Sequence, residues 1–255
     1  MVHASTWFTE DFTLAELKTL RAVERLPDVR PQNTAFNGLF EIPTFQEVID
    51  LAKQHGVGVY PETKHPSYFD SIGLSLEEPL LEALRRNGLD RRGAKVFIQS
   101  FEVWNLKELR RKTRVPLVQL IDAAGAPADF VLNHDPRTYD DLVTRQGLAE
   151  IAQYADGVGP EKSRIVPGNR ANGQLGEPTA LIADAHHAGL LVHPFTFRPE
   201  NDFLAAPFRL GNPSSPEYLR ARGNQPAELA LYYRLGVDGL FADNPDTAVA
   251  LGEFS

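Results

Sequence analysis

The sequence lacks cysteine altogether, has a single methionine, and contains no apolar run of the length needed to cross a membrane. Without cysteine, it can form neither disulfides nor thiolate metal sites and has no cysteine nucleophile. Basic residues are outnumbered, 26 against 34 acidic, and the resulting net charge of -8 argues against nucleic-acid binding and favours a bound cation. The first ten residues also lack the basic start and apolar stretch of an export signal, so we expect no membrane insertion and leave localisation unknown.

What is present is the composition of an ordinary globular protein, with 42% apolar and 24% charged residues. Short apolar runs bounded by turn residues alternate with segments of helical spacing, which is typical of βαβ units. The expected parallel strands are 57–63, 95–100, 116–121, 155–160, 190–195 and 237–242. The expected crossover helices are 44–55, 76–87, 102–112, 140–154, 178–188 and 226–235. Gly56, Gly88, Gly189 and Gly236 each stand where a helix should hand over to a strand, a position that favours left-handed glycine.

Two stretches depart from this alternation. The segment 194–226 is rich in proline, asparagine and serine but carries five aromatic residues, which predicts an ordered loop, either a lid or a substrate contact. The segment 1–43 predicts a short helix at 13–21 with a capping box formed by Thr13 and Glu16, and no strand. Six strands are therefore expected where a closed (β/α)8 barrel has eight, and the pattern alone fits either an open sheet or a barrel missing its first two strands.

Candidate functional residues lie at the carboxyl ends of the expected strands, where parallel α/β folds place their active sites. Glu62 and Lys64 stand two residues apart on one strand, so their side chains point to the same side. The carboxylate suits a hard cation and the ammonium suits a phosphate oxygen, although a plain salt bridge explains the pair equally well. The other strand-end candidates are Gln99, Phe101, Gln119, Asp122, Glu161, Lys162, His193, Phe195, Arg198, Asp243 and Asp246.

The histidines favour structural roles. His193 is expected to be a packed, hydrogen-bonded histidine at a strand end, because no second histidine stands at metal-ligand spacing from it. His186 suits the end of a helix, His134 suits a turn, and His65 before Pro66 suits an extended turn.

Six segments, taken together and in order, resemble one family, the glycerophosphodiester phosphodiesterases, in particular a bacterial, periplasmic-type branch. They are WFTEDFTLAELK from Trp7, PTFQEV from Pro43, YPETK from Tyr60, QSF from Gln99, HPFTFR from His193 and GVDGLFADNPD from Gly236. The resemblance extends over nearly the whole chain from Trp7 onward. It implies an α/β fold of the (β/α)8 TIM-barrel type and a single domain over 1–255, with the long loop at 194–226.

The resemblance also implies an activity and roles for particular residues. The family hydrolyses glycerophosphodiesters, small-molecule substrates, to sn-glycerol 3-phosphate and an alcohol with a divalent metal, Ca²⁺ or Mg²⁺. Glu62 resembles the metal-ligand glutamate of the third strand, and Lys64 resembles the lysine that steadies the phosphate. Phe195 and Phe197 resemble the aromatic side of the glycerol pocket. Members of this branch are often periplasmic or secreted.

The chain departs from the family at its front. The family's first strand carries His-Arg-Gly, its second a Glu-x-Asp pair, and a His-Asp motif follows; these segments would precede Trp7. The two histidines form the acid/base pair, so no catalytic residue is assigned in this chain, which keeps one of three carboxylate ligands. We therefore expect a shortened, incomplete domain that binds metal weakly and has little or no activity alone.

Two alternatives stay open. The chain could be a non-catalytic module that binds a phosphate ligand or another protein. It could also be a different phosphate-handling barrel such as an aldolase, in which Lys64 or Lys95 would form a Schiff base.

Overall fold

The computed structural model describes residues 7–168 and 172–252. The chain divides into two compact units, Met1–His55 and Gly56–Ser255, each of which is described by itself. Whether 1–255 acts as one domain stays a prediction. Gly56 stands at the boundary with a φ of 66°, directly after a helix, as the sequence predicts.

The first unit consists of short helical segments joined by turns. Its elements are η1 (Thr9–Asp11), α1 (Leu14–Leu17), η2 (Pro31–Phe36) and α2 (Phe45–Gln54). The capping box of Thr13 and Glu16 is confirmed, and a second box begins α2. The helix predicted at 13–21 is shorter than expected, because Arg21 leaves the helical path to form an antiparallel bridge with Glu41.

The second unit contains a parallel sheet whose strands follow one another in chain order. The strands are β1 (Ile98–Ser100), β2 (Leu117–Ile121), β3 (Gly157–Pro160) and β4 (Leu191–Val192). In register, Ile98 faces Leu117, Val118 faces Gly157, and Gly157 faces Leu191. Doubly wound sheets reverse their strand order near the middle, whereas barrels add each strand beside the previous one, so this order is that of a barrel-type fold.

The first and last predicted strands are present as isolated parallel bridges rather than regular ladders. Val59 bridges Val96 and Glu62 bridges Gln99 on one side of the sheet, and Phe197 bridges Ala242 on the other. Proline removes ladder donors here: Pro61 lies within the first segment, and Pro194 ends β4 after Val192, earlier than predicted. All six predicted segments thus run parallel and in chain order.

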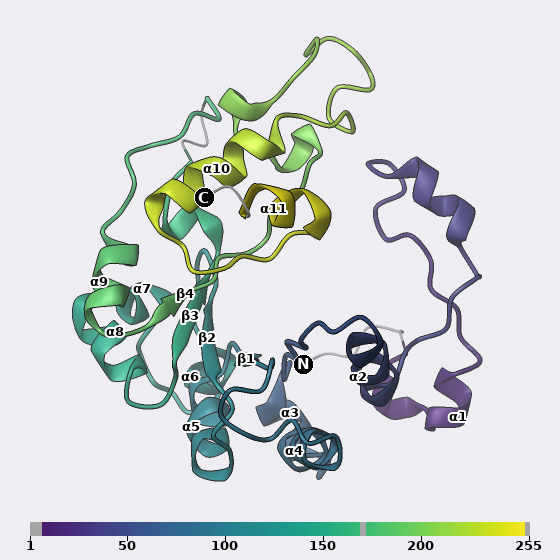
Figure 1. Ribbon diagram of the computed structural model, residues 1–255, viewed down its shortest axis with the longest axis vertical. Helices are drawn as coiled ribbons and strands as arrows, with labels where there is room; N and C mark the ends of the chain where they lie inside the picture. The colour runs from purple at the N-terminus through teal and green to yellow at the C-terminus, as the bar shows by residue number, and fades with distance from the viewer. Residues whose placement is uncertain (1–6, 169–171, 253–255) are drawn as a thin grey trace. The chain divides into compact units, whose positions relative to one another are not determined.

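Helices connect these strands and cover the sheet. They are α3 (Pro66–Ser71), α4 (Glu77–Arg86), α5 (Val103–Lys112), α6 (Ala128–Leu132), α7 (Tyr139–Leu142), α8 (Arg145–Ile151), η3 (Lys162–Arg164), α9 (Leu181–His187), η4 (Asn201–Phe203), η5 (Ala206–Phe208), α10 (Gln225–Leu235) and α11 (Pro245–Gly252). Helix α5 packs against β1 and β2 while α9 packs against β4, on the same side of the sheet (Figure 1). None of the described helices has both the length and the apolar character to cross a bilayer.

The prediction of one continuous helix over 140–154 is wrong, because the chain turns between α7 and α8 and forms two helices. The Thr144 side chain accepts a hydrogen bond from the Gly147 amide at 3.0 Å and begins a new helix. Gly147 also lies against α7, where an added Cβ would come within 2.2 Å of the Asp141 carbonyl oxygen. This close approach requires glycine and fixes the angle between the two helices.

The long segment 194–226 is ordered, as its aromatic content predicts. Asn201 is fully buried, and its side-chain amide donates to the carbonyl oxygens of Leu210 and Tyr218, both at 2.8 Å. Its amide oxygen accepts from the Leu210 backbone at 3.1 Å. One side chain therefore ties together three parts of the loop.

Candidate active site

A cavity of about 330 Å³ opens at the carboxyl ends of the strands in the second unit. Its lining residues come from the ends of the first strand segments, from β2 and from the segments after β4. They are Glu62, Lys64, Gln99, Phe101, Leu120, Phe195, Thr196, Phe241, Ala242 and Asp243. Sequence reasoning singled out six of these as strand-end candidates and missed the others.

Glu62 and Lys64 face this cavity together, as the two-residue periodicity of a strand predicts. Their charged atoms lie 3.8 Å apart, and the Lys64 side chain is 67% exposed while that of Glu62 is 28% exposed. An exposed pair at this distance contributes little to stability. Lys64 is therefore available to an anionic ligand.

Gln99 adds a buried polar group to the same cavity. Its backbone pairs with Pro61 and Thr63, yet its side-chain oxygen Oε1 is buried without a hydrogen-bond partner among the described residues. Buried acceptors in folded proteins are almost always paired, so this one is suited to a donor that a ligand brings, such as a hydroxyl group.

The two aromatic candidates are separated by the structure. Phe195 lines the cavity, with its ring 5.9 Å from that of Phe101 in an edge-on arrangement. Phe197 is fully buried outside the lining, where its ring meets that of Tyr232 at 4.8 Å and the Lys162 ammonium lies 5.4 Å from its centroid. Sequence reasoning missed Phe241, although its place at the end of the last strand segment was a usable signal.

His193 is a packed core residue outside the lining of the cavity, and its packing is as predicted. Its Nδ1 atom lies 3.0 Å from the Tyr60 hydroxyl, and its ring contacts those of Tyr60 and Phe97 edge-on. Burial lowers the pKa of His193, which favours the neutral ring.

The other described histidines of the second unit are absent from the lining of this cavity. His186 pairs with Asp238 at 2.9 Å near the end of α9. His134 adopts a left-handed φ of 55° in the predicted turn after α6. The extended turn predicted at His65 is wrong: the residue has φ 53° and ψ 46°. The right-handed helical region is disfavoured for a residue before proline, and the left-handed conformation of His65 lets Pro66 begin α3 directly.

The strand-end lysine Lys162 is engaged elsewhere. Its Nζ atom forms a 2.7 Å ion pair with Glu228 on α10 and a 3.1 Å hydrogen bond with the Phe203 carbonyl oxygen. The Glu228 side chain is buried, with 3% exposed, and that of Lys162 is partly buried, with 16% exposed. Burial raises the pKa of the Glu228 carboxyl, and Lys162 opposes that shift. No sequence signal connects these two residues, which lie far apart in the chain.

Lys95, the second lysine considered for a Schiff base, lies before β1 at the amino-terminal end of the sheet, opposite the cavity. Its Nζ atom donates to the Gly56 carbonyl oxygen at 2.8 Å. The structure therefore separates Lys95 from Lys64 rather than bringing the two together.

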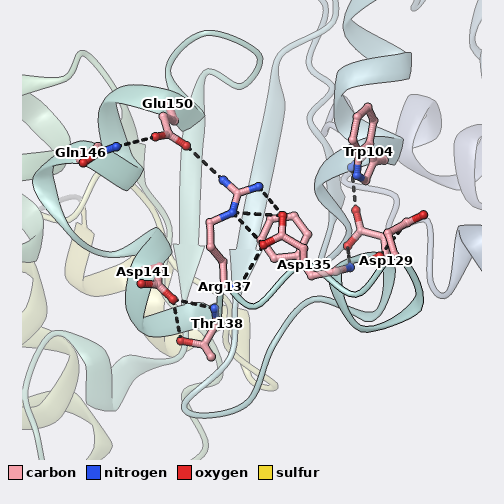
Figure 2. Close-up of polar contacts among 10 residues, drawn as sticks. Trp104, Asp129, Asp135, Arg137, Thr138, Asp141, Gln146 and Glu150 are labelled. Atoms are coloured by element: carbon pink, nitrogen blue, oxygen red, sulfur yellow. Dashed lines mark hydrogen bonds and ion pairs between the residues drawn. The ribbon is translucent and has the colours of Figure 1, made fainter.

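A polar network beside the sheet fixes the turn between α6 and α7 (Figure 2). Arg137 binds Asp135 through two guanidinium nitrogens at 2.6 to 3.1 Å and reaches Glu150 at 3.2 Å. The Arg137 side chain holds the pKa of Asp135 down at about 2. Asp129, also in Figure 2, accepts a hydrogen bond from the Trp104 amide at 2.8 Å at the start of α5.

The lowered pKa of the Asp135 carboxyl predicts that its contribution to the stability of the fold is lost in acid. Because the folded-state pKa lies below the unfolded value of about 4, Asp135 stabilises the fold above that value, and its contribution is lost as the pH falls to about 2. We expect Asp135→Asn to lower the thermal midpoint at pH 7 and to match the wild-type chain near pH 2. Thermal unfolding followed by circular dichroism checks this, and an equal difference at both pH values would contradict it.

The fit of a divalent cation can be tested on the same residues. Glu62 is the carboxylate nearest Lys64 in the cavity, and Asp243 is paired with Arg198 at 3.0 Å. Within residues 7–168 and 172–252, no cluster of three or more acidic or histidine side chains is placed to hold a metal ion. The described residues therefore do not form a metal centre by themselves.

The chain-order parallel sheet, with a cavity at the carboxyl ends of its strands, defines the chain as an α/β protein of the barrel type. The sequence model described as the Glycerophosphoryl diester phosphodiesterase family matches residues 1–247, and the chain belongs to that family.

Curated relatives agree with this assignment. A glycerophosphodiester phosphodiesterase of Arabidopsis thaliana is 37% identical over 93% of this chain and 62% of its own length. One of Haemophilus influenzae is 27% identical over 95% of this chain and 69% of its own length. The chain thus spans less than two thirds of the Arabidopsis protein.

Solved structures confirm the fold. A crystal structure from Silicibacter pomeroyi superposes with a TM-score of 0.62 at 17% identity, covering 98% of this chain and 70% of the other. A glycerophosphodiester phosphodiesterase from Parabacteroides distasonis gives a TM-score of 0.54 at 14% identity, covering 95% and 71%. These likenesses confirm the predicted α/β, TIM-barrel type of fold.

Proposed function

We propose that this chain forms the substrate-binding part of a phosphoric diester hydrolase that acts on glycerophosphodiesters. In that reaction a water oxygen adds to phosphorus, the bond from phosphorus to the alcohol oxygen breaks, and the alcohol leaves with a proton. The products are sn-glycerol 3-phosphate and the free alcohol. The family match over residues 1–247 is the observation that carries this proposal.

The cavity residues suit the two ends of the glycerol phosphate. Lys64 presents an exposed ammonium for the phosphate oxygens, and Gln99 presents an unpaired buried oxygen for a glycerol hydroxyl. The Phe195 ring covers the carbon side of the same cavity. Phe197, buried against Tyr232, lies outside the lining of the cavity and does not meet the ligand.

We further propose that the 255-residue chain alone has little or no turnover. Hydrolysis needs an acid/base pair, and the buried His193 is bound to Tyr60 rather than presented to the cavity. Glu62, with Lys64 at 3.8 Å, binds Ca²⁺ or Mg²⁺ weakly, since these ions require several oxygen ligands. The second candidate function is a module that binds a phosphate ligand without turnover. It is favoured by the contact of His193 with Tyr60 and by the pairing of Glu62 with Lys64.

The test combines binding with turnover on the same protein. We expect titration calorimetry to show glycerol 3-phosphate binding, and we expect Ca²⁺ with glycerophosphocholine to release no glycerol 3-phosphate above a heat-treated control. Metal-dependent release that chelator abolishes would contradict the proposal of low activity. Absence of glycerol 3-phosphate binding would contradict the assignment of the cavity.

A further inference from the structure

A second cavity, of about 270 Å³, lies directly beside the first, and the two share Lys64 and Phe101. Its other lining residues are polar, acidic or aromatic, apart from two alanines. They are Thr63, His65, Glu102, Asp122, Ala126, Ala128 and Tyr139. A ligand with its phosphate at Lys64 therefore has a second compartment into which the rest of the molecule can extend.

Glu102 is the buried charge of this second cavity. Its side chain is almost fully buried, and its Oε2 atom accepts a hydrogen bond from the Ser67 amide at 3.1 Å. Its other oxygen, Oε1, has no hydrogen-bond partner among the described residues. A buried carboxylate oxygen without a partner is costly, so a positive group brought by a ligand would stabilise it.

The surroundings of Glu102 are negative. Burial, together with the charges of Asp129 and Asp70, raises the pKa of Glu102. Burial also raises the pKa of the Tyr139 hydroxyl, and the charges of Asp122, Asp129 and Glu102 act in the same direction. Asp129 is occupied by the backbone amides at the start of α5 and in α6, so the open negative groups are Glu102 and Asp122.

The positive groups of this cavity lie toward its edge. Lys64 stands on the wall shared with the first cavity and is paired with Glu62 at 3.8 Å. His65 is exposed. Lys64 is thus the lysine on the wall that the two cavities share, while Glu62 and Asp243 add negative charge to the first cavity and Glu102 and Asp122 add it to the second.

Aromatic rings complete the second cavity and indicate which kind of cation it suits. The rings of Phe101 and Tyr139 lie 6.3 Å apart at an interplanar angle of 73°. Aromatic faces attract organic ammonium groups, whereas a metal ion needs several oxygen ligands, and no cluster of three acidic or histidine side chains able to hold one occurs in the described ranges.

We propose that the second cavity binds the ammonium group of an amino-alcohol headgroup, between the carboxylates of Glu102 and Asp122 and the rings of Phe101 and Tyr139. This rests on the proposed function, in which Lys64 meets the phosphate. The preferred substrate class is then the zwitterionic glycerophosphodiester, whose negative phosphate meets Lys64 and whose positive nitrogen meets Glu102 and Asp122.

The experiment compares two diesters that differ in headgroup charge. Titration calorimetry in chelator, which prevents metal-assisted turnover, measures the dissociation constants of glycerophosphocholine and glycerophosphoglycerol for the whole chain. We expect the choline diester to bind at least about fivefold more tightly. Equal dissociation constants in the wild-type chain would overturn the inference while leaving the proposed function intact.

Two variants locate the effect. Asp122→Asn and Glu102→Gln are each expected to bring the ratio of the two dissociation constants toward one. Asp122→Asn keeps the side-chain oxygen that accepts a hydrogen bond from the Ala123 amide at 2.7 Å, so it changes the charge alone. It therefore tests the charge even if Glu102→Gln fails to fold because Glu102 also bonds the Ser67 amide. Glu82→Gln removes the same charge on the exposed face of α4 and should leave the ratio unchanged. A ratio that persists in Asp122→Asn would overturn the inference.

A third ligand separates this inference from the proposed function. Saturation-transfer NMR on choline alone should show contact of its methyl protons with the wild-type chain and loss of that contact in Asp122→Asn. If choline binds in this way while neither diester nor glycerol 3-phosphate does, the ammonium site stands and the proposed function fails.

Discussion

Replacing Glu228 with alanine is expected to lower the free energy of unfolding by about 3 to 5 kcal/mol. The substitution leaves the mostly buried Lys162 ammonium without its carboxylate partner, while the Phe203 carbonyl oxygen at 3.1 Å and the Phe197 ring remain beside it. Urea unfolding at pH 7, with the slope of the transition compared between variants, measures the loss. A decrease below about 1 kcal/mol would show that Lys162 finds water or another partner when the pair is broken.

The matched control removes both charges together. In the variant Lys162→Met with Glu228→Leu, neither side chain carries a charge, and we expect most of the stability lost in Glu228→Ala to return. Burial already raises the pKa of Glu228 despite the nearby ammonium, so the desolvation of this carboxylate outweighs its attraction to Lys162. The pair thus fixes the position of α10 against η3 more than it adds net stability.

Replacing Lys64 with methionine is expected to weaken glycerol 3-phosphate binding by at least about tenfold, because the side chain keeps its length and loses its charge-assisted contact with the phosphate. Titration calorimetry in chelator measures the change. Glu62→Gln should instead strengthen glycerol 3-phosphate binding, since it removes a negative charge 3.8 Å from the Lys64 ammonium.

The control for Lys64 is Lys95→Met, which removes the same charge at the other end of the sheet, where the side chain contacts the Gly56 carbonyl oxygen. We expect its affinity for glycerol 3-phosphate to equal that of the wild-type chain. An equal loss in both variants would mean that overall charge, rather than a contact at Lys64, governs binding.

Sequence periodicity predicted the parts of this fold and site that depend on local spacing. Glu62 and Lys64 face one cavity because alternate strand residues share a side, and Gly236 ends α10 with a φ of 94° because a left-handed helix end favours glycine. The chain-order sheet, which decides for a barrel-type fold over an open doubly wound sheet, became visible only in the structure.

Features that depend on long-range contact were not predictable in the same way. The pairing of Lys162 with Glu228 and the burial of Phe197 against Tyr232 join segments that are distant in sequence. The turn between α7 and α8 was hidden because Thr144 and Gly147 stand within a run whose apolar spacing continues across them. In each case tertiary packing overrides a local pattern.

The position of Lys64 on the wall between two cavities has a thermodynamic consequence. If the two cavities bind phosphate and headgroup as proposed, one ammonium contributes to the binding free energy in both compartments. The two affinities are then coupled and cannot be added as independent terms. Evolution of a new headgroup preference in this chain is then constrained, because a substitution that changes the field in one compartment also alters how firmly the phosphate is held in the other.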